Sequence, residues 1–157
     1  MHMKLFHLLL SIPLLLISLV SQANDFDSIL SEKSPPPGVV IEIVSGDNDL
    51  LVSLLPTIKT NIKKLRQKFP DLPIAIVSHG REQFMMTKKN AKANQKTHTL
   101  VETLVKKDNI DFHVCGTHAS WYNVMEEDFP EYVDVSPAGP TQIDDYEQMG
   151  YELIVLP

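Results

Sequence analysis

The chain has 157 residues, 43% of them hydrophobic, and a formal net charge of −6 at pH 7. This length suits one domain with a sizeable core, and the acidic balance argues against a general nucleic-acid-binding protein. The single cysteine, Cys115, excludes an intramolecular disulfide and redox cycling between two thiols of one chain.

The N-terminal segment has the features of a cleaved export signal. Lys4 gives a short positive start, residues 5–20 are almost wholly apolar, and Ser21 and Ala23 are the small residues of a signal-peptidase site. A retained membrane anchor needs about 20 apolar residues, and Pro13 interrupts this run. We therefore expect cleavage after Ala23, export to the periplasm or outside the cell, and no stable membrane anchor.

After the signal, residues 24–38 are expected to form a mobile, Pro-rich lead-in. From residue 39 to 157, short apolar and β-branched runs alternate with stretches in which apolar residues recur every three or four positions. Pro56 falls inside the first of these stretches and predicts a kink or a later helix start. The expected strands are 39–44, 74–77, 111–114, 132–135 and 151–156, and the expected helices are 51–69, 100–107, 119–127 and 140–149.

This alternation predicts the fold class. Strands separated by helices imply right-handed crossovers and a sheet covered on both faces. We expect residues 39–157 to form a single α/β domain with a flavodoxin-like, open, mostly parallel five-stranded sheet and helices on both faces. In such folds ligands bind outside the carboxyl ends of the strands, near the point where the strand order reverses.

Cys115 lies where the third expected strand ends, in the run Val114–Thr117. A thiol at that place faces the ligand-binding crevice. If a helix starts at Gly116 or Thr117, its free N–H groups and positive dipole end favour the reactive thiolate. A cysteine at the end of an apolar strand is also commonly a small buried hydrophobe with no chemistry. Both interpretations remain open at this point.

Two histidines and a basic segment are the candidate supporting groups. His79 follows the second expected strand and His118 follows the thiol, and either could tune its ionisation. The segment 81–96 carries five cations against one acid. It is either a solvated loop or helix face, or a rim whose Lys88 and Lys92 attract an anion to the pocket.

Three segments together resemble the DsrE/DsrF-like family. They are Val114–Thr117 with its cysteine, Val133–Gly139, and Met149–Ile154 after a helix. The resemblance implies a compact α/β fold, assembly as trimers or hexamers, and sulfur relay as a cysteine persulfide. It implies that Cys115 is the sulfur-accepting position and that Gly116 and Thr117 shape the turn after it. The export signal is a departure, because the best-known sulfur relays of this family are cytoplasmic.

The leading hypothesis is an exported, homo-oligomeric protein that binds or relays sulfane sulfur on Cys115. It would be a sulfur-transferase-like carrier rather than a turnover enzyme, with no cofactor, no resident metal and an unidentified sulfur donor and acceptor. One alternative is a non-catalytic oligomeric or small-ligand-binding module with a structural cysteine. Another is a periplasmic copper or zinc binder that uses His79, Cys115 and His118, with His113 nearby, since imidazole and thiolate ligands suit both metals.

Overall fold

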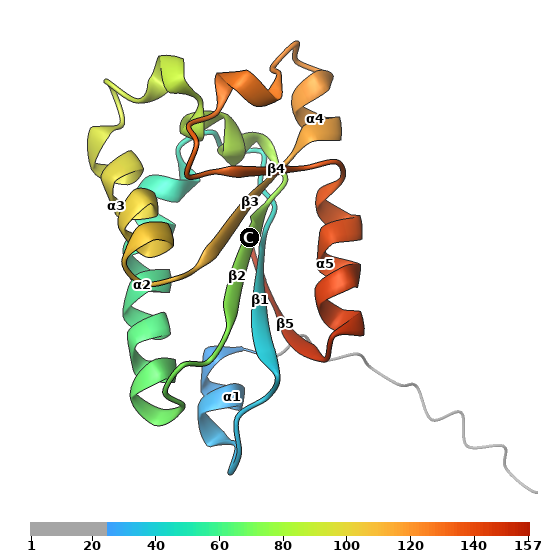
Figure 1. The fold of residues 1–157 in the computed structure, drawn as a ribbon. Coiled ribbons are helices and arrows are strands. Elements are labelled where there is room, and N and C mark those ends of the chain that lie inside the picture. The colour runs from blue at the N-terminus through green and yellow to red at the C-terminus, as the bar shows by residue number, and fades with distance from the viewer. Residues whose placement is uncertain (1–24) are drawn as a thin grey trace, which may run out of the picture.

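Residues 25–157 form one five-stranded sheet with helices, as described by a computed structural model of the chain. The predicted signal peptide, residues 1–23, lies outside the described residues. All four strand pairings are parallel, in the order β4-β3-β2-β1-β5 (Figure 1). The predicted flavodoxin-like α/β class is therefore confirmed. The strands are β1 (Gly38–Ile43), β2 (Ile74–Ser78), β3 (Asp111–Cys115), β4 (Asp134–Ser136) and β5 (Tyr151–Leu156).

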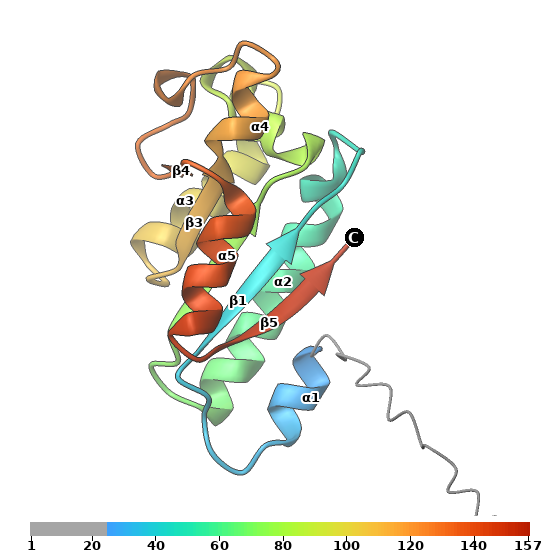
Figure 2. The same cartoon turned by 90° about the vertical axis from the view of Figure 1, so that its right-hand side faces the viewer.

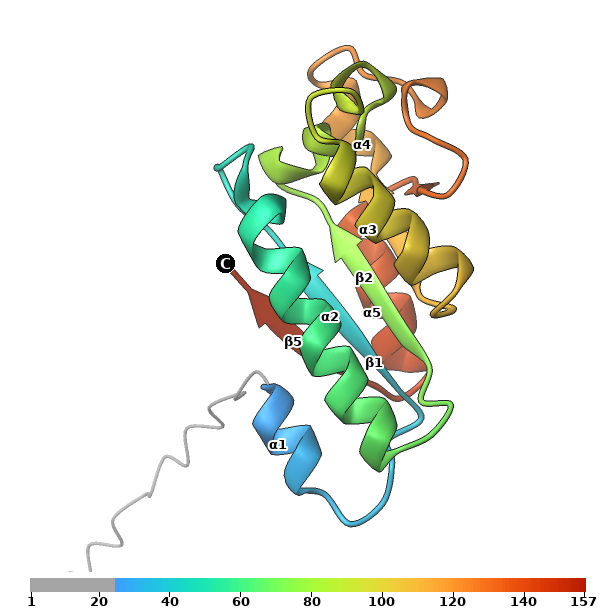
Figure 3. The same ribbon diagram turned by 90° about the vertical axis from the view of Figure 1, so that its left-hand side faces the viewer.

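Helices cover both faces of this sheet. Helices α2 (Leu50–Lys68) and α3 (Gln95–Lys106) lie on one face, and α5 (Gly139–Gln148) lies on the other (Figures 2 and 3). Strands β1 to β4 succeed one another in one direction, whereas the chain returns through α5 to place β5 beside β1. A right-handed crossover that runs back across the sheet must use the opposite face. The strand order therefore reverses at β1, which lies between β2 and β5.

The first long helix passes through its proline without a break. Helix α2 begins at Leu50 and includes Pro56, so the expectation of a later helix start is wrong. Pro56 and Val52 are both exposed, and the Val52 carbonyl, which loses its usual N–H partner at Pro56, can bind water there. Five buried residues on the other side of the helix hold it against the sheet: Leu51, Leu55, Ile58, Ile62 and Leu65.

The helix expected at 119–127 is in the wrong place. Helix α4 (Gly116–Ser120) begins directly after Cys115, and only a short 3₁₀ turn, η3 (Glu126–Asp128), follows. The loop after β4 fixes this early start, because the amide and Oγ1 of Thr117 both donate to the Pro137 carbonyl, at 3.0 and 2.7 Å. The strand expected at 132–135 correspondingly begins later, at Asp134.

The lead-in segment contains a helix that the sequence analysis missed. Helix α1 (Phe26–Ser31) begins after Asp25, whose carboxylate accepts a hydrogen bond from the Ser28 amide at 2.7 Å. Ile29 is fully buried in the main core, and Lys68 at the end of α2 donates to backbone carbonyls at the end of α1. A helix of six residues is too short to produce a recognisable period in the sequence. Among the described residues, no helix has the length and apolar character needed to cross a membrane.

Candidate functional site

The thiol of Cys115 lies at the carboxyl edge of the sheet, between β3 and α4. Its Sγ accepts a hydrogen bond from the His118 amide at an N···S distance of 3.3 Å. An N–H donor that points at sulfur stabilises the thiolate more than the neutral thiol. Only 4% of Cys115 is exposed, so a reagent that reaches the sulfur must be small.

A buried amide connects the thiol-bearing residue with His118. Gln83 belongs to the 3₁₀ helix η1 (Arg81–Met86) and is fully buried. Its Oε1 accepts from the Cys115 amide at 2.8 Å, and its Nε2 lies 2.9 Å from Nδ1 of His118. One side chain therefore sets the position of the cysteine backbone and of the neighbouring imidazole.

The residue before it, Glu82, anchors η1 to the ends of two strands. Its carboxylate is fully buried and accepts three hydrogen bonds, from the Ser45 amide (2.9 Å), the Ser78 hydroxyl (2.8 Å) and the Gly80 amide (2.9 Å). A Cβ on Gly80 would lie 2.3 Å from this carboxylate and 2.4 Å from the Ser45 backbone. Glycine is required there because the three segments approach so closely, and the contact holds Gln83 in place.

His79 is paired with a carboxylate beside the thiol. Its Nε2 lies 2.7 Å from Oε1 of Glu42, and the two side chains are only 13% and 19% exposed. Gly139, the first residue of α5, separates His79 from Cys115. A Cβ built on Gly139 would lie 2.6 Å from the Cβ of His79 and 3.3 Å from the Cβ of Cys115. The structure thus brings His79, His118 and Cys115 to one edge of the sheet, as the sequence analysis expected.

The imidazole of His118 has two competing partners. Its Nδ1 lies 2.8 Å from the His79 carbonyl as well as 2.9 Å from Nε2 of Gln83. Because Oε1 of Gln83 is occupied by the Cys115 amide, Nε2 is a donor. A protonated Nδ1 therefore donates to the His79 carbonyl, whereas an unprotonated Nδ1 accepts from Gln83. Phe84, Trp121 and Tyr122 surround the ring, with centroids 5.4–5.5 Å away.

The two lysines proposed to attract an anion are placed elsewhere. Nζ of Lys88 donates to the Glu127 carbonyl at 2.7 Å, and Lys92 is exposed to solvent. Within residues 25–157, neither forms a hydrogen bond or ion pair with Cys115, His79 or His118. Two other cations of the same segment, Arg81 and Lys89, line a cavity at this edge of the sheet.

The histidine and thiol groups do not form a metal centre in the part of the chain that the structure describes, where no group of three or more His, Cys, Asp or Glu side chains is arranged to hold an ion. His113 instead binds the Tyr146 hydroxyl through Nε2 at 2.9 Å. Its Nδ1 lies 2.8 Å from Oδ2 of Asp134 but out of line for a hydrogen bond, so this contact is an ion pair only when the ring is protonated. Burial, followed by the charge and hydrogen bond of Asp111, raises the pKa of Tyr146.

Comparison with known proteins gives information on the fold of this chain only. No family model and no curated protein matches the chain. A solved structure from Methanobacterium thermoautotrophicum, described as the protein of unknown function MTH1491, superposes with a TM-score of 0.59 at 16% sequence identity. The match covers 75% of this chain and 97% of that one. It supports the α/β fold independently of the sequence patterns.

Glu82 and Gln83 are the site residues that the sequence analysis missed. They lie in a segment that is rich in cations, a composition that predicts a solvent-exposed loop or helix face. The only local signal is the pair Met85 and Met86, whose burial requires the chain around them to turn inward. That pattern indicates a packed segment, but it does not identify the partners of the two polar side chains.

Proposed function

We propose that Cys115 is a nucleophilic thiolate that accepts a sulfane sulfur atom and passes it on as a persulfide, in an exported protein. The observation that carries this proposal is the hydrogen bond from the His118 amide to Sγ at 3.3 Å. The bond stabilises negative charge on the sulfur and holds it at the edge where parallel sheets bind ligands. The resemblance of the cysteine segment to DsrE/DsrF-like proteins supports the same chemistry.

The transfer needs no oxidant or reductant beyond the donor. The Cys115 thiolate attacks the outer sulfur of thiosulfate or a polysulfide, and a new S–S bond forms. The S–S bond of the donor breaks, and its electron pair leaves on sulfite or on the shortened polysulfide. In the second half, an acceptor thiolate attacks the outer sulfur of the persulfide and releases the Cys115 thiolate.

The neighbouring groups have defined roles in this scheme. The His118 amide would stabilise the thiolate and Gln83 would hold the Cys115 backbone in place. His79, oriented by Glu42, would supply positive charge when it is protonated. With 4% of Cys115 exposed, the proposal favours small inorganic donors over bulky ones.

Intact-mass spectrometry of the mature protein tests the proposal. After exposure to thiosulfate or polysulfide we expect a mass gain of about 32 Da per sulfur atom that a reductant reverses and that the Cys115→Ser variant lacks. If the native protein gains no mass, while Cys115 is alkylated only after denaturation, the residue is a packing group. The alternative of a non-catalytic module with a structural cysteine would then replace the sulfur carrier.

Assembly and location form part of the proposal and have their own measurements. We propose a homo-oligomer, to be checked by light scattering coupled to size-exclusion chromatography. We also propose periplasmic or secreted localisation, to be checked by cell fractionation and N-terminal sequencing of the exported form. A monomer in solution would contradict the proposed homo-oligomer. A chain that keeps residues 1–23 would contradict the proposed export and cleavage.

A further inference from the structure

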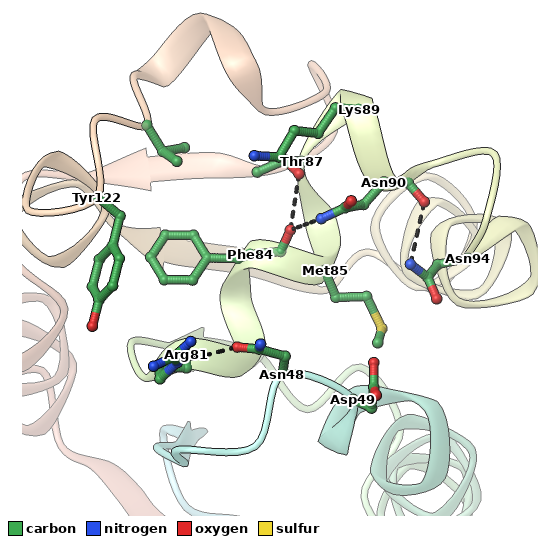
Figure 4. Close-up of a pocket in the computed structure, with 11 residues that line it drawn as sticks. Asn48, Asp49, Arg81, Phe84, Met85, Thr87, Lys89, Asn90, Asn94 and Tyr122 are labelled. Atoms are coloured by element: carbon green, nitrogen blue, oxygen red, sulfur yellow. Dashed lines mark hydrogen bonds between the residues drawn. The ribbon is translucent and has the colours of Figure 1, made fainter.

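A cavity of about 440 Å³ lies at the carboxyl edge of the sheet, separate from the residues that hold Cys115. Its walls come from the loop after β1, from the segment containing η1 and η2 (Lys88–Asn90), and from the residues after α4 (Figure 4). Three segments far apart in the sequence thus line it, and its volume falls in the range of small-molecule sites.

Two cations that have no anionic partner among the described residues line this cavity. Nε of Arg81 donates to Oδ1 of Asn48 at 3.3 Å, and its guanidinium lies over the Tyr122 ring, 5.7 Å from the centroid. The two terminal nitrogens of Arg81 and Nζ of Lys89 make no hydrogen bond or ion pair within residues 25–157. In the part of the chain that the structure describes, Asp49 is the one acid of the lining. In a chain with a net charge of −6, this concave positive site is distinctive.

The orientation of Arg81 suits recognition of a planar acid group. Asn48 and Tyr122 hold the guanidinium through Nε and through its face, which leaves both terminal nitrogens available. This fork of two donors matches the two oxygens of a carboxylate, and less rotamer freedom is lost on binding because the side chain is already positioned.

The cavity also has an apolar wall. The rings of Phe84 and Tyr122 meet edge to face with centroids 4.9 Å apart, and both line the cavity together with Met85 (Figure 4). Val124 adds to the same lining. An inorganic anion would leave these apolar side chains in contact with water. A ligand with a flat carbon skeleton would cover it and gain from contact with the aromatic rings.

We propose that this cavity binds a small organic anion. Its carboxylate pairs with Arg81, and its unsaturated or aromatic body packs against Phe84 and Tyr122. Lys89, on the other side of the Phe84 ring (Figure 4), adds positive charge to the cavity. The proposal is independent of sulfur transfer, since Cys115 does not line the cavity. The two sites are nevertheless neighbours, because Phe84 also contacts the His118 ring at 5.5 Å.

Calorimetric titration of the mature protein with 2-naphthoate tests the proposal, with the uncharged 2-naphthamide and inorganic sulfate as matched probes. We expect 2-naphthoate to bind more tightly than either. Arg81→Gln should weaken 2-naphthoate binding about tenfold, as expected for loss of a charge-assisted bidentate pair. Tyr122→Leu should weaken it as well by removing the aromatic wall. Lys92→Gln, an exposed cation of the same segment outside the cavity, should change nothing.

Three results would overturn the inference. One is the absence of 2-naphthoate binding at millimolar concentration, and another is equal binding by the protein and its Arg81→Gln variant. The third is sulfate binding as tight as that of 2-naphthoate, which would mean that charge alone is recognised and that the aromatic wall is not used. Because Arg81 is exposed, its substitution should not prevent folding, and a thermal melt of each variant checks this.

Discussion

The buried carboxylate of Glu82 should contribute strongly to the stability of the carboxyl edge, and Glu82→Gln measures that contribution. The carboxylate offers two oxygens to three donors. A glutamine can keep its one oxygen on the Ser78 hydroxyl and the Gly80 amide, but its NH₂ group then faces the Ser45 amide. Two donors would oppose each other in a fully buried place.

The expected cost follows from these contacts. A hydrogen bond to a charged group contributes about 1.5–3 kcal/mol, and a neutral one about half as much. Loss of the Ser45 bond therefore costs about 2 kcal/mol, and weakening of the other two adds about 1 kcal/mol. We expect the free energy of unfolding to fall by about 3 kcal/mol, which corresponds to a melting temperature lower by roughly 10 °C for a domain of this size.

Urea unfolding followed by circular dichroism is the appropriate assay. The matched control is Glu102→Gln, which removes an exposed carboxylate that pairs with Lys106 at 2.7 Å on α3. That change should cost less than about 0.5 kcal/mol, because exposed helix pairs contribute little. If Glu82→Gln lowers the free energy of unfolding by less than about 1 kcal/mol, the three contacts do not anchor η1 as argued.

Two further substitutions test other contacts. Gly139→Ala places a Cβ 2.6 Å from that of His79, so it should lower the free energy of unfolding by about 1–3 kcal/mol through overpacking and change the alkylation rate of Cys115. The control is Gly46→Ala, whose Cβ would meet no atom within 4 Å and which should change neither stability nor alkylation. Equal behaviour of the two variants in melting and alkylation would contradict the packing argument. Burial, then the hydrogen bond and charge of Glu32, raises the pKa of Glu152, so its ionised form penalises the folded state at neutral pH. Glu152→Gln should therefore raise the melting temperature at pH 7. This gain should shrink as the pH falls below the raised pKa, and it should vanish at a pH below the ordinary pKa of a glutamate, where the carboxyl group is protonated in both the folded and the unfolded state. A gain in melting temperature that does not depend on pH would refute the assigned cause.

The last expected helix, 140–149, ends close to the end of α5. Gly150, directly after it, has a φ of +85°, the left-handed conformation in which helices commonly end and which glycine adopts without strain. Gly116 or Thr117 was a possible start of α4, beside the expected helix 119–127. The sequence could not decide between them, because no residue near Gly116 shows that Pro137, twenty positions after Thr117, accepts its hydrogen bonds.

What the sequence determined by itself was the fold class and the position of the Cys115 thiol at the carboxyl end of the third strand. The spacing of apolar residues is a local property of each segment. It predicts that strands alternate with helices along the chain and that the thiol lies at the end of the third strand. What only the tertiary structure decided was the surroundings of that thiol and the lining of the neighbouring cavity. Gln83 meets Cys115 across 32 positions of sequence, and Arg81 and Lys89, rather than Lys88 and Lys92, line the cavity. Such partners depend on how separate segments pack at the sheet edge, and the period of one segment carries no information about the position of another.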